Sequence, residues 1–434
     1  MKYFSTNNPT PKVSLKEAVL RGYAPDMGLY IPEKLPVIPN AFIRNMSGMS
    51  LQEISYAVAN TLFGGDIPAE VLHDIVYTTM NFDIPLRKIS DNIFALELFH
   101  GPSLNFKDVG TRFMARLLSY LRGADNRKIN IITATSGGSG GAIANGYLDV
   151  PGVHVFVLFP HNKLSKTLES QFTTLGHNIT PIEINGSYND CQDLVRAAFA
   201  DSTLAAKMRL TSANSINIAR LLPQTFYYFH AYAQLSACMQ PLPKVSFSIP
   251  CGNLGNLVSA VISKKMGLGI NKIMAATGPN CDLSRFMSSG FFNSFEAGRS
   301  IMPAMDVATP NNLPRLLPLF DNSLNELNYS VATKSVTEAQ VADTIRTVYQ
   351  KYDYMLDPHS ATAYYALSTM LSPNEAGIVT ATAHPAKSKR VIDYLLKTDI
   401  ELPQALVSDS SRKRNVVKLP AIYSHLRNLL LTYS

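Results

Sequence analysis

The most constraining feature of this 434-residue sequence is a repeated pattern: a short run rich in β-branched and apolar residues, then a turn, then a helical segment. The run "KINIITAT" (128–135) precedes the glycine-rich turn "SGGSGG" and the segment "AIANGYL". Similar runs are "VHVFVLF" (153–159), "KVSFSIP" (244–250) and "AGIVTATA" (376–383). Such runs are typical of strands buried on both faces, and parallel strands need helical connections. The pattern therefore predicts an α/β protein with parallel sheets.

Length and composition favour a globular protein of two or three domains. Hydrophobic residues make up 46% of the chain and charged residues 16%, which is enough apolar material for a large core. The N-terminal stretch lacks the apolar segment of a signal peptide, and no run of about 18 apolar residues indicates a membrane span. The cysteines are scattered without a CxxC pair, which disfavours zinc and disulfides and predicts a cytoplasmic protein; they are Cys191, Cys238, Cys251 and Cys281.

The formal net charge of +7 is modest for this length. The short run "RKR" (412–414) is too brief to indicate nucleic-acid binding and is expected on a solvated face. A mild positive balance suits a small anionic substrate.

Residues 1–88 form a leading segment with its own signals. Ser14 followed three residues later by Glu17 is a capping box, and Gly22 ends the helical pattern that follows. The stretch "GLYIPEKLP" then predicts a short strand and a turn. No candidate catalytic cluster is evident in this segment.

Two loops share one architecture, in which a strand leads through a glycine-rich turn into a helix: "TSGGSGG" (135–141) and "CGNLGN" (251–256). The first amides of a helix have no partner inside it, so both loops are candidate anion sites. The first loop lacks the Gly-Lys-Ser/Thr of a P-loop and has Ile143 where a dinucleotide motif needs its third glycine. The pair predicts a phosphorylated cofactor and an acidic or phosphorylated substrate; the alternative is two tight turns without ligands.

Lys107 stands between Phe106 and Asp108 in "ELFHGPSLNFKDVGTRFM" (97–114), at the start of a predicted helix. Lysine usually lies on a solvated face, so one interpretation is a surface Lys–Asp pair. A phosphate-bearing cofactor that needs a lysine is pyridoxal 5'-phosphate, whose aldehyde condenses with the amine. The apolar neighbour Leu104 would help to desolvate such a lysine and lower its pKa. The two loops together with Lys107 favour this second interpretation.

Five stretches occur in the order and approximate spacing of the threonine synthase family: "ELFHGPSLNFKDVGTRFM", "TATSGGSGGA", "LTSANSINIAR", "IPCGNLGN" and "TATAHPAK". The opening "AVLRGYAPDMGLYIPEKLP" also resembles that family's N-terminal domain. The resemblance spans nearly the whole chain. The motifs are specific for the family when they occur together. It implies a fold type II pyridoxal-phosphate enzyme of the tryptophan-synthase-β superfamily, with two parallel-sheet α/β domains and an extra N-terminal α+β domain.

We expect three domains on this basis. Residues 1–88 would form the N-terminal domain. Residues 89–112 and 241–434 would form a large cofactor-binding domain, and residues 113–240 a smaller substrate-binding domain.

The resemblance implies roles for residues at matching positions. Lys107 matches the catalytic lysine that forms a Schiff base with the cofactor. The other cofactor-binding positions are a loop that holds the phosphate and a hydroxyl facing the pyridine nitrogen: Gly252, Asn253, Leu254, Gly255, Asn256 and Thr382. The substrate-binding positions are two donors for the carboxylate and four residues for the phosphate: Thr135 and Ser136, then Ser139, Asn214, Ser215 and Arg220. An arginine suits the last task because its guanidinium can grip phosphate oxygens bidentately.

One position departs from the family pattern. Gly138 replaces an Asp or Asn that in the family lies near the 3' oxygen of the cofactor. Glycine offers only its backbone N–H there, so that side-chain contact is absent.

The resemblance implies a carbon–oxygen lyase of threonine biosynthesis that converts O-phospho-L-homoserine and water to L-threonine and phosphate by β,γ-elimination and water addition. We expect a monomer or homodimer that binds neither nucleic acid nor membrane. Two alternatives remain: a phospho-lyase that yields a keto acid from phosphothreonine or phosphohomoserine, and a non-catalytic cofactor-binding relative. An amino-acid dehydratase needs no phosphate pocket, so "NSINIAR" argues against it.

Overall fold

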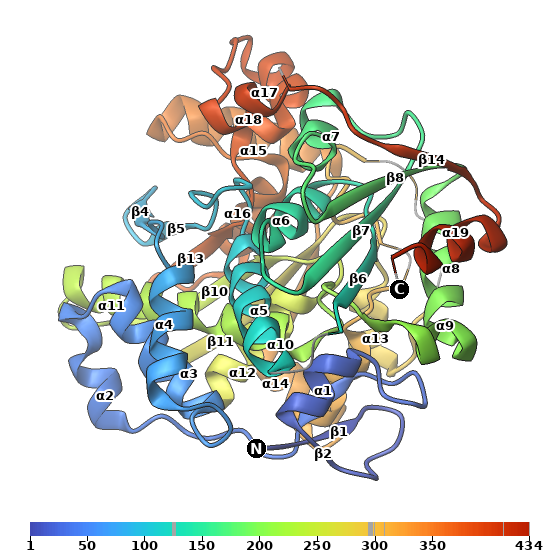
Figure 1. Cartoon of the computed structure of the whole chain (residues 1–434). Helices are drawn as coiled ribbons and strands as arrows, with labels where there is room; N and C mark the ends of the chain where they lie inside the picture. The colour runs from blue at the N-terminus through green and yellow to red at the C-terminus, as the bar shows by residue number, and fades with distance from the viewer. Residues whose placement is uncertain (124–126, 294–297, 299, 308, 411, 434) are drawn as a thin grey trace. The chain divides into compact units, whose positions relative to one another are not determined.

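The structure is a computed structural model that describes residues 1–123, 127–293, 298, 300–307, 309–410 and 412–433. The chain divides into two compact units, each assembled from segments far apart in the sequence (Figure 1). The first unit comprises Met1, Ile31–Phe106 and Leu221–Glu401. The second unit comprises Lys2–Tyr30, Lys107–Arg220 and Leu402–Ser434.

A six-stranded sheet organises the first unit, with strand order β12-β11-β10-β13-β5-β4. All neighbouring strands are parallel except β4 and β5. In chain order the strands are β4 (Leu86–Lys88), β5 (Ile93–Glu97), β10 (Lys244–Pro250), β11 (Ile270–Thr277), β12 (Val331–Ser335) and β13 (Glu375–Ala381). The carboxyl ends of parallel strands lie at the same edge of a sheet. Ligands usually bind at this edge, at the point where the strand order reverses. The chain passes from β10 to β11 and β12 on one side, while β13 and β5 lie on the other.

Several helices of the first unit pack on this sheet, and α16 contacts β10, β11 and β13. The α-helices are α2 (Asn40–Asn45), α3 (Leu51–Phe63), α4 (Ala69–Thr79), α11 (Phe226–Cys238), α12 (Gly255–Lys265), α13 (Leu283–Ser289), α14 (Leu324–Ser330), α15 (Glu338–Tyr352), α16 (Pro358–Met370) and α17 (Lys389–Leu396). Short 3₁₀ turns are η1 (Met46–Gly48), η2 (Leu222–Thr225), η3 (Leu313–Arg315), η4 (Leu317–Phe320) and η5 (Pro385–Ser388). Apolar residues of β5, β11 and β13 pack with those of α15 and α16 to form one core.

A five-stranded, wholly parallel sheet organises the second unit, with order β14-β8-β7-β6-β9. Strands β14, β8, β7 and β6 are labelled in Figure 1. In chain order the strands are β6 (Ile129–Ala134), β7 (Val153–Pro160), β8 (Ile179–Asn185), β9 (Arg209–Thr211) and β14 (Val417–Pro420). Strands β7 and β8 follow β6 on one side, and β9 lies on its other side. The loops after β6 and β9 therefore flank the point where the strand order reverses.

The helices of the second unit include both ends of the chain. They are α1 (Leu15–Arg21), α5 (Lys107–Arg122), α6 (Gly138–Tyr147), α7 (Lys166–Thr173), α8 (Tyr188–Ala200), α9 (Ser202–Lys207), α18 (Gln404–Ser410) and α19 (Tyr423–Leu431), and α10 (Ile218–Leu221) ends where the chain enters the first unit. The short strands β1 (Lys2–Ser5) and β2 (Val13–Ser14) pair antiparallel near the N-terminus, and β3 (Tyr30–Pro32) follows α1. Apolar residues of α8, α9 and α19 pack on β6, β7 and β8.

The predicted α/β class with parallel sheets is confirmed. The apolar run at 128–135 contains β6, whose six residues are all buried, and the run at 244–250 is β10. The Ser14 hydroxyl accepts the Glu17 N–H at 3.2 Å and begins α1, as the capping signal indicates. The three-domain division stays a prediction. Among the two compact units, residues 402–434 lie with the second one.

None of the described helices is both long enough and apolar enough to span a bilayer.

Candidate active site

The segment that leads to Lys107 is tied to the end of β13. The Phe106 N–H donates to the carbonyl of Thr382 at 2.9 Å, and the His384 N–H donates to the carbonyl of Leu104 at 3.2 Å. Leu104 takes a left-handed backbone conformation with φ 54°, an unusual state for a branched residue. These bonds fix the residue directly before Lys107 against Thr382, which is itself buried.

Lys107 is the first residue of α5, and its ammonium donates to the Ser139 hydroxyl at 2.8 Å. Both side chains are only partly buried. The contact joins the predicted cofactor lysine to the glycine-rich loop after β6, within the second unit. Sequence reasoning predicted a role for each residue but not this hydrogen bond.

The Thr135 hydroxyl organises that loop from inside. It accepts the N–H of Gly140 at 2.9 Å and the N–H of Gly137 at 3.3 Å, and it donates to the Gly137 carbonyl at 3.0 Å. These bonds hold the turn that opens α6. The expected contact of Thr135 with a substrate carboxylate stays a prediction. Ser136 is exposed.

The loop after β9 lies beside the loop after β6. Strand β9 pairs with β6, and the Thr133 hydroxyl near the end of β6 donates to the Asn214 side-chain oxygen at 2.9 Å. Asn214 and Ser215 are partly buried. The two predicted substrate segments are thus brought together at the carboxyl edge of one sheet.

Arg220 is a buried cation, with 3% of its surface exposed. Its Nη1 donates to the Ala213 carbonyl at 2.6 Å. Burial lowers the pKa of Arg220 to about 10, against the opposing influence of Tyr147 and Asp108, so the guanidinium remains charged near neutral pH. A Cβ on Gly110 would lie 2.2 Å from the Arg220 carbonyl oxygen, which shows that α5 and Arg220 meet backbone to backbone.

The segment that holds Arg220 also contacts the N-terminal helix. The Asn217 side chain donates to the Val19 carbonyl at 2.9 Å, and the Thr211 hydroxyl donates to the same carbonyl at 3.3 Å. Sequence reasoning assigned no site role to the N-terminal segment. The only signal was Asn217 itself, within "NSINIAR".

The predicted phosphate loop lies in the first unit, between β10 and α12. A Cβ on Gly252 would lie 2.3 Å from the carbonyl oxygen of Ala304, so only glycine fits there. Leu254 has φ 58° and precedes Gly255, the first residue of α12. The opening amides of α12 have no partner inside the helix, which suits a phosphate.

The hydrogen bonds of the Asn256 side chain show that this loop suits a phosphate-bearing cofactor. Its Oδ1 accepts the hydroxyls of Tyr227 and Tyr228, each at 2.6 Å. Its Nδ2 is buried and has no hydrogen-bond partner among the described residues. An oriented, unsatisfied amide donor at the start of a helix fits an anionic ligand group.

Further residues that sequence reasoning missed support the loop. The side chain of Asn312 donates to the Asn253 carbonyl at 2.9 Å, and the Asn311 N–H donates to the Asn253 side chain at 3.1 Å. The fully buried Arg315 donates to Asn312 at 2.6 Å. The polar run "NNLPR" within an apolar stretch was the available signal.

The predicted residues fall into two groups. One group lies in the second unit: Lys107, Thr135, Ser136, Ser139, Asn214, Ser215 and Arg220. The other lies in the first unit: Gly252, Asn253, Leu254, Gly255, Asn256 and Thr382.

Comparison with known families gives two matches. Residues 2–80 match the family model "Threonine synthase N terminus", and residues 78–380 match "Pyridoxal-phosphate dependent enzyme". A curated threonine synthase of Haemophilus influenzae is 39% identical over 409 residues, which cover 94% of each chain. The threonine synthase of Escherichia coli is 36% identical over 436 residues, with 100% of both chains covered. The chain belongs to the threonine synthase family.

Solved structures of threonine synthases agree with this fold. The structure of the Escherichia coli threonine synthase matches with a TM-score of 0.92 and 35% identity, covering 100% of both chains. The "PLP bound" threonine synthase from Brucella melitensis matches with a TM-score of 0.93 and 31% identity, covering 100% of this chain and 99% of that one. The chain is therefore a pyridoxal-phosphate-dependent enzyme with the fold of the threonine synthase family.

Proposed function

We propose that this enzyme converts O-phospho-L-homoserine and water to L-threonine and phosphate. The observation that carries the proposal is the arrangement around α5. Lys107 at its first turn reaches Ser139 at 2.8 Å, and Gly110 lies against the backbone of the buried cation Arg220. The amine for proton transfer is thus on α5, and the cation for phosphate is on α10, whose backbone packs against α5.

The residues of the first unit suit the cofactor. We propose that the N–H groups of Gly255 and Asn256, with the Asn256 side chain, bind its phosphate, and that Gly252 allows the close approach. The Thr382 hydroxyl would face the pyridine nitrogen, and Lys107 would hold the aldehyde end. When bound, the cofactor supplies the electron sink that makes the substrate Cα–H acidic.

We assign proton transfer to Lys107 and phosphate stabilisation to Arg220. The Lys107 amine takes the proton at Cα, a second proton leaves Cβ, and phosphate leaves Cγ with the electron pair of the C–O bond. Arg220, with Ser139, Asn214 and Ser215, would bind the phosphate as it gains charge. The oxygen of water then adds at Cβ, and protons return to Cα and Cγ. The Thr135–Ser139 loop would orient the substrate carboxylate meanwhile.

The proposal also covers the cellular compartment, the oligomeric state and the binding partners of the enzyme. We propose a cytoplasmic enzyme that works as a monomer or homodimer on this small molecule and binds no nucleic acid. The free state of all four cysteines supports a reducing compartment.

The test is an assay of the purified holoenzyme with O-phospho-L-homoserine, measuring threonine and phosphate. Lys107→Arg keeps a cation but removes the primary amine, so it should lose both products and the cofactor absorbance typical of the lysine adduct. Lys128→Ala removes an exposed lysine of the same unit and should retain both. A keto acid in place of threonine would instead identify a phospho-lyase, and product formation by Lys107→Arg would refute the role of Lys107.

A further inference from the structure

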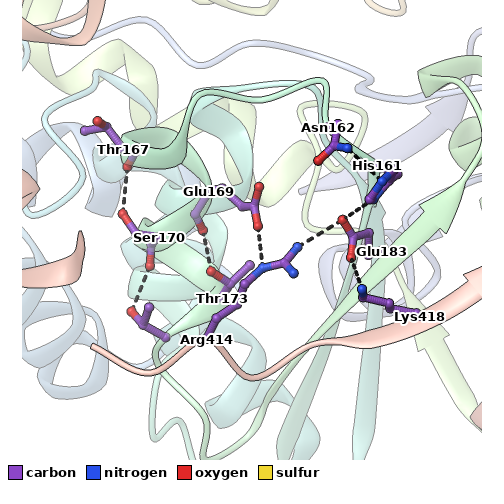
Figure 2. A network of polar contacts seen from close by, with 10 residues as sticks. His161, Asn162, Thr167, Glu169, Ser170, Thr173, Glu183, Arg414 and Lys418 are labelled. Carbon is purple, nitrogen blue, oxygen red and sulfur yellow. Dashed lines mark hydrogen bonds and ion pairs between the residues drawn. The ribbon is translucent and has the colours of Figure 1, made fainter. Parts of the chain in front are cut away.

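An ion-pair network joins the C-terminal segment to the earlier segments of the second unit. Arg414 Nε contacts the Glu169 carboxylate at 2.6 Å, and its Nη2 contacts Glu183 at 3.0 Å (Figure 2). His161 Nδ1 lies 2.7 Å from the same Glu183 oxygen, and Lys418 lies at 4.0 Å from the other. Glu169 is on α7, and Glu183 is on β8.

Glu183 makes this network more than a surface pairing. Only 3% of its side chain is exposed, whereas 41% of the Arg414 side chain is exposed. Burial alone would raise the pKa of Glu183, but hydrogen bonds from His161 and Arg414 outweigh it and hold that pKa below its usual value. The guanidinium therefore has a fixed anchor on the sheet, from which it reaches Glu169 on α7.

A second contact secures the other end of α7. The Asn415 N–H donates to the carbonyl of Thr173, the last residue of α7, at 2.7 Å. Arg414 thus contacts the first turn of α7 through Glu169, and Asn415 contacts the last residue of the same helix.

Helix α7 in turn packs directly on the start of α6. The Asn145 side chain donates to the Gln171 carbonyl at 3.1 Å. A Cβ on Gly140 would lie 3.0 Å from the Phe172 ring, and one on Gly141 would lie 2.9 Å from the Gln171 side chain. A contact this close leaves α6 little freedom to move unless α7 moves with it.

The start of α6 carries the substrate loop. Gly140 donates its N–H to the Thr135 hydroxyl at 2.9 Å, and the Ser139 hydroxyl accepts from Lys107 at 2.8 Å. A continuous set of contacts therefore runs from Arg414 through α7 and α6 to the loop.

We infer that Arg414 and Glu169 are positioning residues that hold the Thr135–Ser139 loop in its substrate-binding geometry. The inference rests on the proposed function, which assigns the substrate carboxylate to this loop. It gives the C-terminal segment a part in substrate affinity, although it carries none of the residues proposed to bind substrate.

Steady-state kinetics of the holoenzyme with O-phospho-L-homoserine test the inference. Glu169→Gln removes the charge on α7 but leaves Arg414 paired with Glu183, so the buried carboxylate keeps its partner. We expect KM to rise about fivefold in Glu169→Gln and at least as much in Arg414→Ala, with kcat within about twofold of wild type. Arg414→Lys should recover part of the lost affinity. The double variant Glu169→Gln with Arg414→Ala should have the same KM as Arg414→Ala alone, because both changes break the same ion pair.

Lys413→Ala is the matched control, because it removes an exposed cation from the adjacent position. An unchanged KM in both Glu169→Gln and Arg414→Ala would overturn the inference, whatever their melting temperatures. A KM rise of equal size in Lys413→Ala would overturn it too, since the rise would then come from the loss of any positive charge in this segment.

Amide hydrogen exchange separates this inference from the proposed function. The amides of residues 136–141 should exchange faster in Glu169→Gln and Arg414→Ala than in wild type or Lys413→Ala. This readout needs no turnover. If the wild-type enzyme makes no threonine, the proposed function fails, and the exchange rates still show whether Arg414 and Glu169 hold the loop; equal rates would refute that.

Discussion

At the scale of single residues, Arg220 shows how the fold keeps a cation in its interior. The guanidinium is 3% exposed, donates to the Ala213 carbonyl and lies near Asp108. Burial lowers its pKa to about 10, so the guanidinium still carries its full charge at neutral pH. A buried cation is costly unless it is compensated, so an anionic ligand would gain strongly from it.

Replacement of this residue by lysine should weaken phosphate recognition. Lysine keeps the charge but cannot offer the bidentate fork, so we expect Arg220→Lys to raise KM for O-phospho-L-homoserine about tenfold. Inhibition by inorganic phosphate should weaken in parallel, while the cofactor absorbance stays unchanged. Arg116→Lys, on an exposed position of α5, is the control. An Arg220→Lys enzyme with wild-type KM would show that Arg220 does not bind the phosphate.

Gly252 illustrates a residue whose backbone must approach another backbone. Because a Cβ there would meet the Ala304 carbonyl at 2.3 Å, Gly252→Ala must displace the phosphate loop. We expect the affinity for pyridoxal 5'-phosphate to fall about tenfold or more, measured by titration of the apoenzyme. Gly65→Ala should have no effect, since nothing lies within 4 Å of a Cβ at that position. Equal affinities in the two variants would exclude the proposed loop role.

At the scale of elements, α11 orients a side chain at the start of α12. Tyr227 and Tyr228 at the start of α11 both donate to the Asn256 side-chain oxygen, which fixes the direction of its amide nitrogen. Two donors to one oxygen make the arrangement redundant, because either hydroxyl alone would keep the amide in place.

This redundancy predicts a non-additive pair of substitutions. Tyr227→Phe and Tyr228→Phe alone should each reduce cofactor affinity by about twofold, whereas the double variant should lose about tenfold. Fluorescence titration of the apoenzyme with pyridoxal 5'-phosphate measures the effect. Tyr120→Phe, which removes an exposed hydroxyl, is the control. Additive losses would mean that the two hydroxyls act independently of each other, and they would refute the proposed redundancy.

Local signals predicted the elements well. The continuous apolar runs became buried strands, and the predicted helical segment "AIANGYL" forms most of α6 (Gly138–Tyr147). The supports of the site could not be predicted in this way. Asn312 contacts Asn253, and Asn217 contacts Val19, only because strand order brings distant segments together. No periodicity of 2 or 3.6 residues encodes such a contact.

At the scale of the whole molecule, the placement of the C-terminal segment could not be predicted from the sequence. Residues 402–434 lie with the second unit, where β14 extends the sheet and α19 adds Leu426 and Leu430 to the core. The strand "VKLP" is short and ends in proline, a weak strand signal. Because β14 pairs with β8, more than 200 residues earlier in the chain, its partner could not be read from local pattern.

Asp201 joins this late segment to the middle of the chain, and we expect it to make the stability of the molecule depend on pH. It caps α9 through the N–H groups of Thr203 and Leu204, at 2.9 and 3.0 Å. It also accepts the Tyr423 hydroxyl at 2.7 Å and the Arg427 Nε at 2.8 Å, both from α19. The Tyr423 hydrogen bond, with the Leu204 N–H and Arg427, lowers the pKa of Asp201 to about 2.

The sign of the pH effect follows from that shift. A carboxylate with a pKa below its unfolded value of about 3.8 stabilises the folded state fully above the unfolded pKa, and the contribution is lost as the pH falls toward the folded pKa of about 2. Asp201→Asn should therefore lower the melting temperature most above about pH 5, and the gap to wild type should narrow between about pH 4 and about pH 2.5. Thermal melts over this range, with Asp91→Asn as an exposed control, measure the gap. A gap that stays constant with pH would mean that the Asp201 charge does not hold α19 in place, and that packing of its apolar residues does so alone.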